Sequence, residues 1–584
     1  MKGLLIIIAA IFLFTGCAVM KVPDFARVPE KPGTYPRFTS KDSLIGQLDA
    51  DREGYDVFFY DLDLDLDPAG KSIGGTVDIH FRAMSALTVL RIDLYRNLSI
   101  SGITLSGEEV LWKRYDRAVS VSLPRPLLPG HEYIMTVEYE GRPTRAKNPP
   151  WEGGTLWKKD ANGNPWVAIA CETEGASLWF PCKDHLSDEP DSVRFRMTVP
   201  AGLQVVSNGI LLSHTSLQEK ETYTWLTRYP VNIYNITFYA GKYEHFNDTM
   251  LTPQGILDLD YYVLPQNLAR AKEHFLQVKD IISLYSRLYG PYPWIREGFR
   301  LVEAPYEGME HQTAIAYGSG YSNRAWLGGD YIIVHEAAHE WWGNAVSVSD
   351  LSDIWIHEGF ATYSEMLFAE YTLGYENSLL YARYHVASEI RNRFPVSGPA
   401  GVGYWNARNN DVCNKGAMIL HTIRNIVNDS ILFFDILQTF YSEHAAASHV
   451  TSGDFIKIVE RKTGKDWHNF FEVYLYSRKV PVLHWYYSPA GNEGASGAPI
   501  GYGSPVIAAK WTGVPEGFSM PVELYCKEQN VTITIEVTTK PELFYNEALS
   551  ECASLICNRR LSYFNPVTVK SVLHEAGSYG PGVK

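Results

Sequence analysis

The period of hydrophobic and polar positions changes twice along this chain of 584 residues. From about residue 51 to residue 248, apolar and polar residues alternate, as in "YDLDLDLD", "TVDIHFRAM", "DSVRFRMTVP" and "YNITFYAGKYEHF", with Pro and Gly between the runs. Alternation with a period of two is typical of strands that are buried on one face. The pattern therefore predicts a β-rich domain over residues 51–248.

The pattern becomes helical near Asn267. The run "LARAKEHFLQVKDIISLYSRLYG" has apolar residues three and four apart and stops at "GPYPW", and similar patterns continue to about Arg478. This predicts a mixed, mostly α domain over residues 249–480. After a stretch rich in Gly and small residues, alternation returns in "MPVELY" and "VTITIEV", which predicts a β-sandwich over residues 481–584. Because the chain exceeds what one hydrophobic core supports, the fold class expected is multidomain α+β.

Four alternating aspartates in the first run have two interpretations. They are Asp61, Asp63, Asp65 and Asp67. A cluster of carboxylates can bind calcium, but calcium loops wrap around the ion, whereas alternation in a strand puts these side chains in a row on one face. A charged, solvated face is the favoured interpretation.

The N-terminus has the pattern of an export signal. Lys2 precedes an apolar run at residues 4–14, which is too short to span a bilayer, and small residues then lead to Cys17. Small residues that end at a Cys are typical of a bacterial lipobox, where the Cys is lipidated. The prediction is a lipoprotein signal peptide at residues 1–17, a linker at 18–50, and a protein anchored by lipid on Cys17 in the cell envelope; a plain signal peptide with a chance Cys is the alternative.

The net charge of the chain limits which kinds of partner it can bind, and its cysteine content limits how much disulfide bonding can stabilise it. The formal net charge of −14 argues against nucleic acid or an anionic membrane surface as partner. An exported chain can form disulfides, but six cysteines after Cys17 are too few for a disulfide scaffold in a chain of this length. A bond between Cys552 and Cys557 is one pairing that the spacing allows.

The run "YIIVHEAAHEWWGN" is the strongest chemical signal of the chain. If Asp330 caps a helix here and Gly343 ends it, His335 and His339 lie one turn apart on the same face and can bind one ion. Glu336 lies beside them, where it can act as a general base without binding the metal. Zinc is the metal expected for such a pair; two buried, hydrogen-bonded histidines are the alternative.

A catalytic zinc needs a third protein ligand. In "DIWIHEGFATYSEMLFAEYTLG", Glu358 follows His339 in a second helix that we expect to be capped near Asp353. Glu365, two turns further on nearly the same face, could accept a hydrogen bond from a zinc-binding histidine. His357 is a rival ligand beside Glu358.

These motifs resemble those of the M1 family of zinc aminopeptidases, the gluzincins. The spacing from His335 and His339 to Glu358 is the family spacing; "YEGMEHQTAIAYG" is similar to its GxMEN exopeptidase motif, and "ACETEGASLWFPCKDH" is similar to the segment that places a second glutamate opposite. The resemblance implies that Glu310 and Glu172 bind the substrate's free ammonium. It also implies an N-terminal β saddle, a thermolysin-like catalytic domain and a C-terminal β-sandwich, with one zinc ion per chain and peptides with a free N-terminus as substrates.

The chain departs from the family pattern at two places. Glu307 and His311 replace the first Gly and the last Asn of GxMEN, and Cys413 in "DVCNKGAMIL" stands where the family has the tyrosine that donates to the oxyanion. A thiol is a weaker donor on a shorter side chain. The favoured function is a zinc aminopeptidase; a catalytically weakened, zinc-containing peptide-binding lipoprotein and a zinc endopeptidase are the alternatives.

Overall fold

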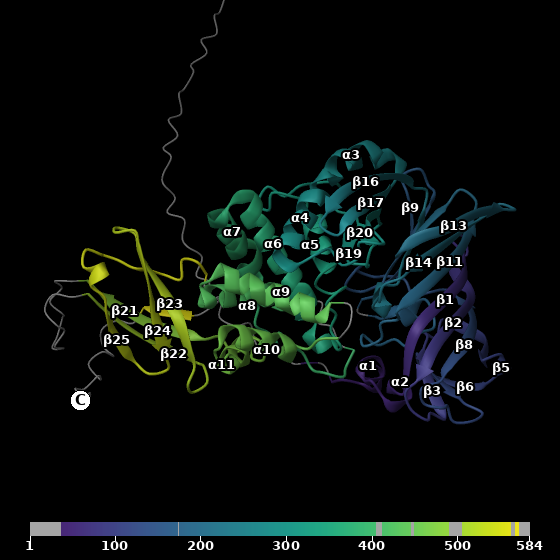
Figure 1. The fold of residues 1–584 in the computed structure, drawn as a ribbon, viewed down its shortest axis with the longest axis horizontal. Coiled ribbons are helices and arrows are strands. Elements are labelled where there is room, and N and C mark those ends of the chain that lie inside the picture. The colour runs from purple at the N-terminus through teal and green to yellow at the C-terminus, as the bar shows by residue number, and fades with distance from the viewer. Residues whose placement is uncertain are drawn as a thin grey trace, which may run out of the picture.

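The computed structural model describes residues 35, 37–172, 174–403, 411–445, 449–489 and 505–561, and the backbone of 567–570. The predicted signal peptide, Cys17 and most of the predicted linker lie outside the described residues. The described end of that linker forms the short helix α1 (Ser40–Gly46), and α2 (Ala50–Glu53) begins at its last residue; both helices lie against the N-terminal β domain (Figure 1). None of the described helices is both long enough and apolar enough to cross a membrane.

The N-terminal domain is built almost entirely from β-sheet, as the alternation predicts. Its largest sheet has eight strands in the order β13-β14-β11-β1-β2-β8-β4-β5, and β1 pairs in parallel with β11 and antiparallel with β2. The strands of this sheet are β1 (Tyr55–Asp67), β2 (Ser72–Ala83), β4 (Leu98–Leu105), β5 (Glu108–Glu109), β8 (Glu132–Gly141), β11 (Ser192–Pro200), β13 (Ile210–Leu217) and β14 (Lys220–Thr227). Two smaller sheets contain β3 (Val89–Asp93), β7 (Ala118–Ser122) and β6 (Leu111–Tyr115), and β12 (Gln204–Ser207), β15 (Phe238–Gly241), β10 (Pro165–Ala170) and β9 (Gly154–Lys159).

The alternating aspartates of β1 form a charged face. Along the strand, apolar residues are buried while every second position is more exposed. Asp63 lies 2.8 Å from a guanidinium nitrogen of Arg196, and Asp65 lies 3.0 Å from the ammonium of Lys220. Asp61 pairs with an arginine of β11 in the same way. These cross-strand ion pairs agree with a solvated strand face, and the calcium interpretation is wrong.

The central domain joins a five-stranded sheet to a group of helices (Figure 1). The sheet order is β16-β17-β18-β20-β19, so β19 is an edge strand. Its strands are β16 (Glu244–Thr252), β17 (Gly255–Val263), β18 (Phe299–Glu303), β19 (Gly308–Met309) and β20 (Ile315–Tyr317). Its α-helices are α3 (Leu268–His274), α4 (Val278–Tyr289), α5 (Tyr331–His339), α6 (Trp355–Leu373), α7 (Tyr375–Tyr381), α8 (Asp411–Val427), α9 (Ser430–His444), α10 (Ser452–Thr463) and α11 (His468–Tyr474). The predicted boundary between residues 248 and 249 falls inside β16.

Two local expectations about these helices need correction or refinement. The long helical run after Asn267 is divided into α3 and α4 by a 3-10 turn, and α4 ends at Tyr289, directly before Gly290, whose φ of 127° few other residues adopt. Asp353 does not cap α6. Its carboxylate accepts a hydrogen bond from the hydroxyl of Ser452, and the turn before the helix is capped by Asp350.

The C-terminal region consists of two small sheets, as expected for a β-sandwich. One contains β25 (Glu542–Tyr545), β22 (Val506–Thr512), β21 (Val482–Ser488) and β27 (Val567–Lys570), and the other β24 (Val531–Thr538), β23 (Ser519–Cys526) and β26 (Ile556–Cys557). Cys526 and Cys552 form a disulfide, so the pairing of Cys552 with Cys557 is wrong. Cys557 instead lies on β26, opposite Leu524.

Candidate metal centre and active site

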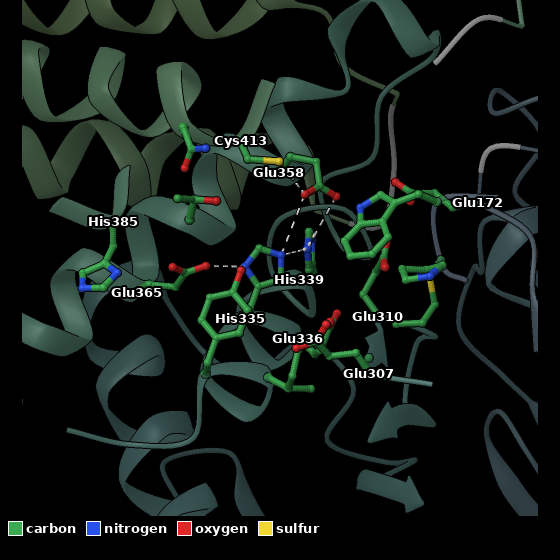
Figure 2. A pocket seen from close by; sticks show the side chains of 18 of the residues that line it. Glu172, Glu307, Glu310, His335, Glu336, His339, Glu358, Glu365, His385 and Cys413 are labelled. Atoms are coloured by element: carbon green, nitrogen blue, oxygen red, sulfur yellow. Dashed lines mark hydrogen bonds and ion pairs between the residues drawn. The ribbon is translucent and has the colours of Figure 1, made fainter. Parts of the chain in front are cut away.

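Helices α5 and α6 bring three metal-ligating side chains together (Figure 2). Asp330 caps α5 as predicted, accepting from the backbone N–H groups of residues 332 and 333. One helical turn then places Nε2 of His335 3.2 Å from Nε2 of His339. Glu358 in the first turn of α6 has one carboxylate oxygen 3.8 Å from Nε2 of His335 and the other 3.9 Å from Nε2 of His339.

This donor set fits zinc. Two ligand atoms bound at about 2.0–2.1 Å in a tetrahedral site lie roughly 3.3–3.5 Å apart, close to the separations found here. Two imidazoles and one carboxylate are a donor set of catalytic zinc, which leaves the fourth position open. His335, His339 and Glu358 are therefore the residues that would hold the ion.

The other nitrogen of each histidine is held by a hydrogen-bond partner. Nδ1 of His335 lies 2.5 Å from a carboxylate oxygen of Glu365, the contact that the spacing along α6 predicts, and Glu365 also accepts from the hydroxyl of Tyr381. Nδ1 of His339 lies 2.8 Å from the carbonyl of Trp342. A carbonyl only accepts, so Nδ1 of His339 carries the hydrogen and Nε2 offers its lone pair to the centre. Burial lowers the pKa of His339 to about 4, which keeps the imidazole neutral.

The rival ligand His357 does not take part in this centre. It is fully buried, and its Nε2 accepts the backbone N–H of Val348 at 3.0 Å. None of the groups of converging ligand atoms among the described residues includes His357. The third metal ligand, and the negative charge among the three ligands, is therefore the carboxylate of Glu358 and not the imidazole of His357.

Glu336 borders the centre from α5. It lines the same cavity and is 6% exposed. Its carboxylate is packed against Gly308 so closely that a Cβ on that glycine would lie 2.4 Å from Oε1. Burial, followed by the charges of Glu310 and Glu358, raises the pKa of Glu336 well above its ordinary value. A carboxylate with a raised proton affinity beside an open metal position is placed to act as a general base.

Glu172 and Glu310 converge on the opposite side of the cavity (Figure 2). One oxygen from each, with one from Glu358, lie within 4.8 Å of one another. Glu310 accepts a hydrogen bond of 3.1 Å from the hydroxyl of Tyr234. Oε1 of Glu172 is buried and has no partner among the described residues. Burial and then the charge of Glu310 raise the pKa of Glu172 well above its ordinary value. A cation bound between the two carboxylates would reduce their repulsion and stabilise their charged forms.

The two departures from the family motifs have different structural settings. Cys413, in the first turn of α8, donates from its thiol to a carboxylate oxygen of Glu358 at 3.2 Å. The thiol is thus directed at a metal ligand. His311 is fully buried, with Nδ1 2.7 Å from the hydroxyl of Tyr239, and packs into the N-terminal domain instead of the cavity. Tyr404, nine residues before Cys413, is a second candidate in the sequence for the donor to the oxyanion, and it lies outside the described residues.

Several residues of the site carry no recognisable motif. The cavity has a volume of about 310 Å³, and its aromatic walls include Trp151, Trp326 and Tyr381. The ring of Trp326 stacks on His385 at 4.3 Å between centroids. Trp151 lies far from the zinc motif in the sequence, whereas Trp326 precedes α5 and Tyr381 and His385 follow α6; no motif marks any of them, and tertiary packing brings them to one wall. Asn344 is different, because it is the last residue of the sequence run that contains the histidines, and its place in that run marks it as a candidate site residue. Its side-chain amide donates to the carbonyl of Glu310 at 2.8 Å.

Two family models match the chain. The model of the peptidase family M1 domain matches residues 309–474, and the model of the peptidase M1 N-terminal domain matches residues 58–234. Probable aminopeptidase 2 of Sulfurisphaera tokodaii is 21% identical over 461 residues, which are 75% of this chain and 55% of that protein. Leukotriene A-4 hydrolase of Xenopus laevis is 22% identical over 342 residues, which are 54% of this chain and 52% of that protein. The chain spans about half the length of these relatives.

Solved structures show the same fold. A mutant of the M1 zinc metallopeptidase of Deinococcus radiodurans, with a Tyr-Ser-Ala substrate bound, superposes with a TM-score of 0.63 at 23% identity. The alignment covers 76% of this chain and 98% of that one. The crystal structure of the M1 zinc metallopeptidase from the same organism gives a TM-score of 0.61 at 24% identity and covers 73% of this chain and 94% of that one. The shared fold thus extends over about three quarters of this chain and nearly the whole of each solved chain.

Proposed function

The chain belongs to the M1 family of peptidases, and from this premise we propose that it is a zinc-dependent aminopeptidase that removes residues from the N-terminus of peptides. The observation that carries the proposal is the buried carboxylate oxygen of Glu172, which has no hydrogen-bond partner among the described residues and lies with Glu310 beside the histidine and glutamate cluster. Burying a carboxylate charge without a partner costs free energy, unless a bound ligand provides a group of opposite charge as the partner. A substrate ammonium supplies it.

The binding step follows from the two carboxylates. Glu172 and Glu310 accept hydrogen bonds from the ammonium of the first residue and so fix how far the first peptide bond lies from the metal centre. A peptide whose amine is acetylated would leave both carboxylates buried against an uncharged group. The site should therefore reject it, and this rejection separates an aminopeptidase from an endopeptidase.

The chemical step uses Glu336 as the proton carrier. When bound to His335, His339 and Glu358, zinc supplies a Lewis acid that polarises a carbonyl and acidifies water. Glu336 accepts a proton from the attacking water and passes it to the leaving amine. Glu365 and the carbonyl of Trp342 keep the two imidazoles oriented throughout.

The function is tested with one peptide in two forms. A pentapeptide with a free amine and its N-acetylated twin are incubated with the full chain, and the products are identified by mass spectrometry. Release of single residues from the free peptide alone is expected. Cleavage of the acetylated twin inside the chain would favour an endopeptidase, and binding without cleavage of either would favour a peptide-binding protein.

The proposal includes an anchor on Cys17 in the bacterial cell envelope, because small residues ending at Cys follow a short apolar run. Replacing Cys17→Ser should move the protein from the membrane fraction to the soluble fraction after cell lysis. A variant that stays with the membrane would contradict lipid anchoring. Turnover of peptides should be unchanged in the variant, since the anchor precedes the catalytic domains.

A further inference from the structure

A second groove adjoins the active-site cavity at Glu307. This residue lines the cavity and also a surface groove whose walls include Pro305, Tyr306 and two lysines, Lys158 and Lys159. The lysines are exposed and end β9, the edge strand of a sheet of the N-terminal domain. The groove and the cavity therefore share Glu307, and residues of both domains line the groove.

A substrate peptide bound in extended form along β19 would run from the cavity toward this groove. Strand β19 is the edge of the catalytic sheet, and Gly308, Met309 and Glu310 line the cavity. A peptide that adds to this edge in the antiparallel sense, with its ammonium at Glu310, runs past Gly308 toward Pro305. At about 3.3 Å per residue, its third and fourth residues lie beside the groove.

The groove wall is held by hydrogen bonds between the domains. The indole of Trp166 donates to the carbonyl of Glu303 at 3.2 Å, and the hydroxyl of Tyr306 donates to the carbonyl of Ile169 at 2.8 Å. On the other side, the N–H of Gly318 donates to the carbonyl of Glu307 at 2.8 Å. The segment between β18 and β19 is thus bound to both domains, and the groove is formed before any peptide arrives.

The cavity is lined by acidic residues, whereas lysines predominate among the charged residues of the groove. The glutamates that line the cavity are Glu172, Glu307, Glu310, Glu336, Glu358 and Glu365. The groove is lined by Lys158 and Lys159, together with Glu307 where it meets the cavity, and no carboxylate of the described residues lies within ion-pair distance of either ammonium. An extended peptide would therefore meet acidic groups at its N-terminus and basic groups three or four residues later.

We propose that Lys158 and Lys159 form a carboxylate-binding subsite for the third and fourth residues of the peptide substrate. The inference rests on the proposed aminopeptidase function and adds a preference to it. The carboxylate comes from an acidic side chain or from the C-terminus of a short peptide. Both sources present the same chemistry to the two ammonium groups.

The test compares kcat/KM for two tetrapeptide amides, Ala-Ala-Glu-Glu and Ala-Ala-Gln-Gln, which differ in charge but hardly in shape. The wild-type chain should prefer the Glu peptide by roughly three- to tenfold at low salt, and 1 M NaCl should remove most of the preference. The doubly changed chain, Lys158→Glu and Lys159→Glu, should lose or invert the preference. The free acid of Ala-Ala-Gln-Gln distinguishes a C-terminal carboxylate from a side-chain carboxylate.

Two controls keep the outcomes apart. Alanyl-p-nitroanilide does not reach the groove, so the double variant should hydrolyse it at the wild-type rate. Lys113→Glu changes an exposed lysine on another strand of the same domain and should leave the peptide preference unchanged. A wild-type chain without preference, a double variant that keeps it, or an equal loss with the anilide would overturn the subsite.

Failure of the proposed function gives a different result. In that case neither the anilide nor any peptide is turned over. The subsite is then judged by the dissociation constants of the two tetrapeptide amides, measured by calorimetry on the wild-type and doubly changed chains. Equal affinity of the wild-type chain for both peptides would overturn it in that setting as well.

Discussion

The two halves of the active-site cavity are constructed in different ways. In the metal-binding half, His335, His339 and Glu358 lie on two packed helices of one domain, and each histidine has a second hydrogen bond that fixes its ring. In the substrate-binding half, Glu310 follows an edge strand of the catalytic sheet, while Glu172 lies in a turn of the N-terminal domain. One oxygen of Glu172 has no partner among the described residues.

The difference separates two tasks. The metal-binding half is complete before the ligand arrives, because every imidazole nitrogen either faces the centre or is bonded. In the substrate-binding half, two buried carboxylates have no cationic partner among the described residues. A site that binds an ammonium requires such carboxylates. Substitutions in the first half should change metal content or the chemical step, and substitutions in the second should change which N-termini are accepted.

Glu336→Gln should give the largest effect on turnover. The amide cannot accept a proton, so kcat should fall by about 10²- to 10⁴-fold, while zinc remains bound because Glu336 is not among the three converging ligands. Metal analysis and turnover of alanyl-p-nitroanilide are measured on the same preparation. Loss of zinc comparable to that in Glu358→Ala would place Glu336 among the ligands and contradict its assigned role.

Glu310→Gln or Glu172→Gln should weaken recognition of free N-termini. A hydrogen bond to a charged group contributes about 1.5–3 kcal/mol, so kcat/KM for a free-amine peptide should fall roughly 10- to 150-fold. Zinc content should stay at the wild-type value, which distinguishes this half of the cavity from the other. If either variant still strongly prefers the free peptide to its acetylated twin, that glutamate does not bind the ammonium.

Glu365→Ala should weaken metal binding without removing a ligand. Loss of a partner that orients a ligating histidine typically costs about 10- to 100-fold in metal affinity. Competition with a chelator measures this affinity. Glu370→Ala is the matched control on the same helix, since Glu370 pairs with Arg424 away from the cavity. Equal affinities of the two variants would show that the contact with His335 has no effect on the metal.

Cys413→Tyr should give the smallest change, and it should be a gain. The thiol donates to Glu358, whereas a phenol in its place would reach further into the cavity and could donate to the oxyanion. We expect kcat to rise about tenfold with little change in KM. Turnover and melting temperature are measured together, with Cys413→Ser as the control that keeps a short donor. A folded Cys413→Tyr protein with unchanged or lower kcat would mean that another donor already serves the oxyanion.

The metal-binding half could be predicted from the sequence because its geometry is local. Residues four apart on a helix share a face, so His335 and His339 are neighbours whatever the rest of the chain does. Glu358 and Glu365 required only a second helix packed on the first. The substrate-binding half could be predicted only through the resemblance to M1 peptidases, since Glu172 and Glu310 come from different domains and no periodicity relates them.

The fold shows the same limit. Alternation identifies the strands of the N-terminal domain and even the charged face of β1, because burial on one side of a sheet imposes the pattern. Pairing across long separations is not visible in this way. Cys552 forms its disulfide with Cys526, 26 residues away, and not with the nearby Cys557. Trp326 and His385, which stack in the cavity wall, likewise carry no local signal.

The central claim is that the two halves of the cavity act on one bound peptide. The most direct measurement is a crystal structure of the Glu336→Gln chain with zinc and a free-amine tripeptide. The account predicts one zinc ion at about 2.0–2.2 Å from His335, His339 and Glu358. It also predicts the peptide's ammonium between Glu172 and Glu310, with the first carbonyl directed at the metal. A peptide bound with its N-terminus elsewhere, or a metal held by other residues, would contradict it.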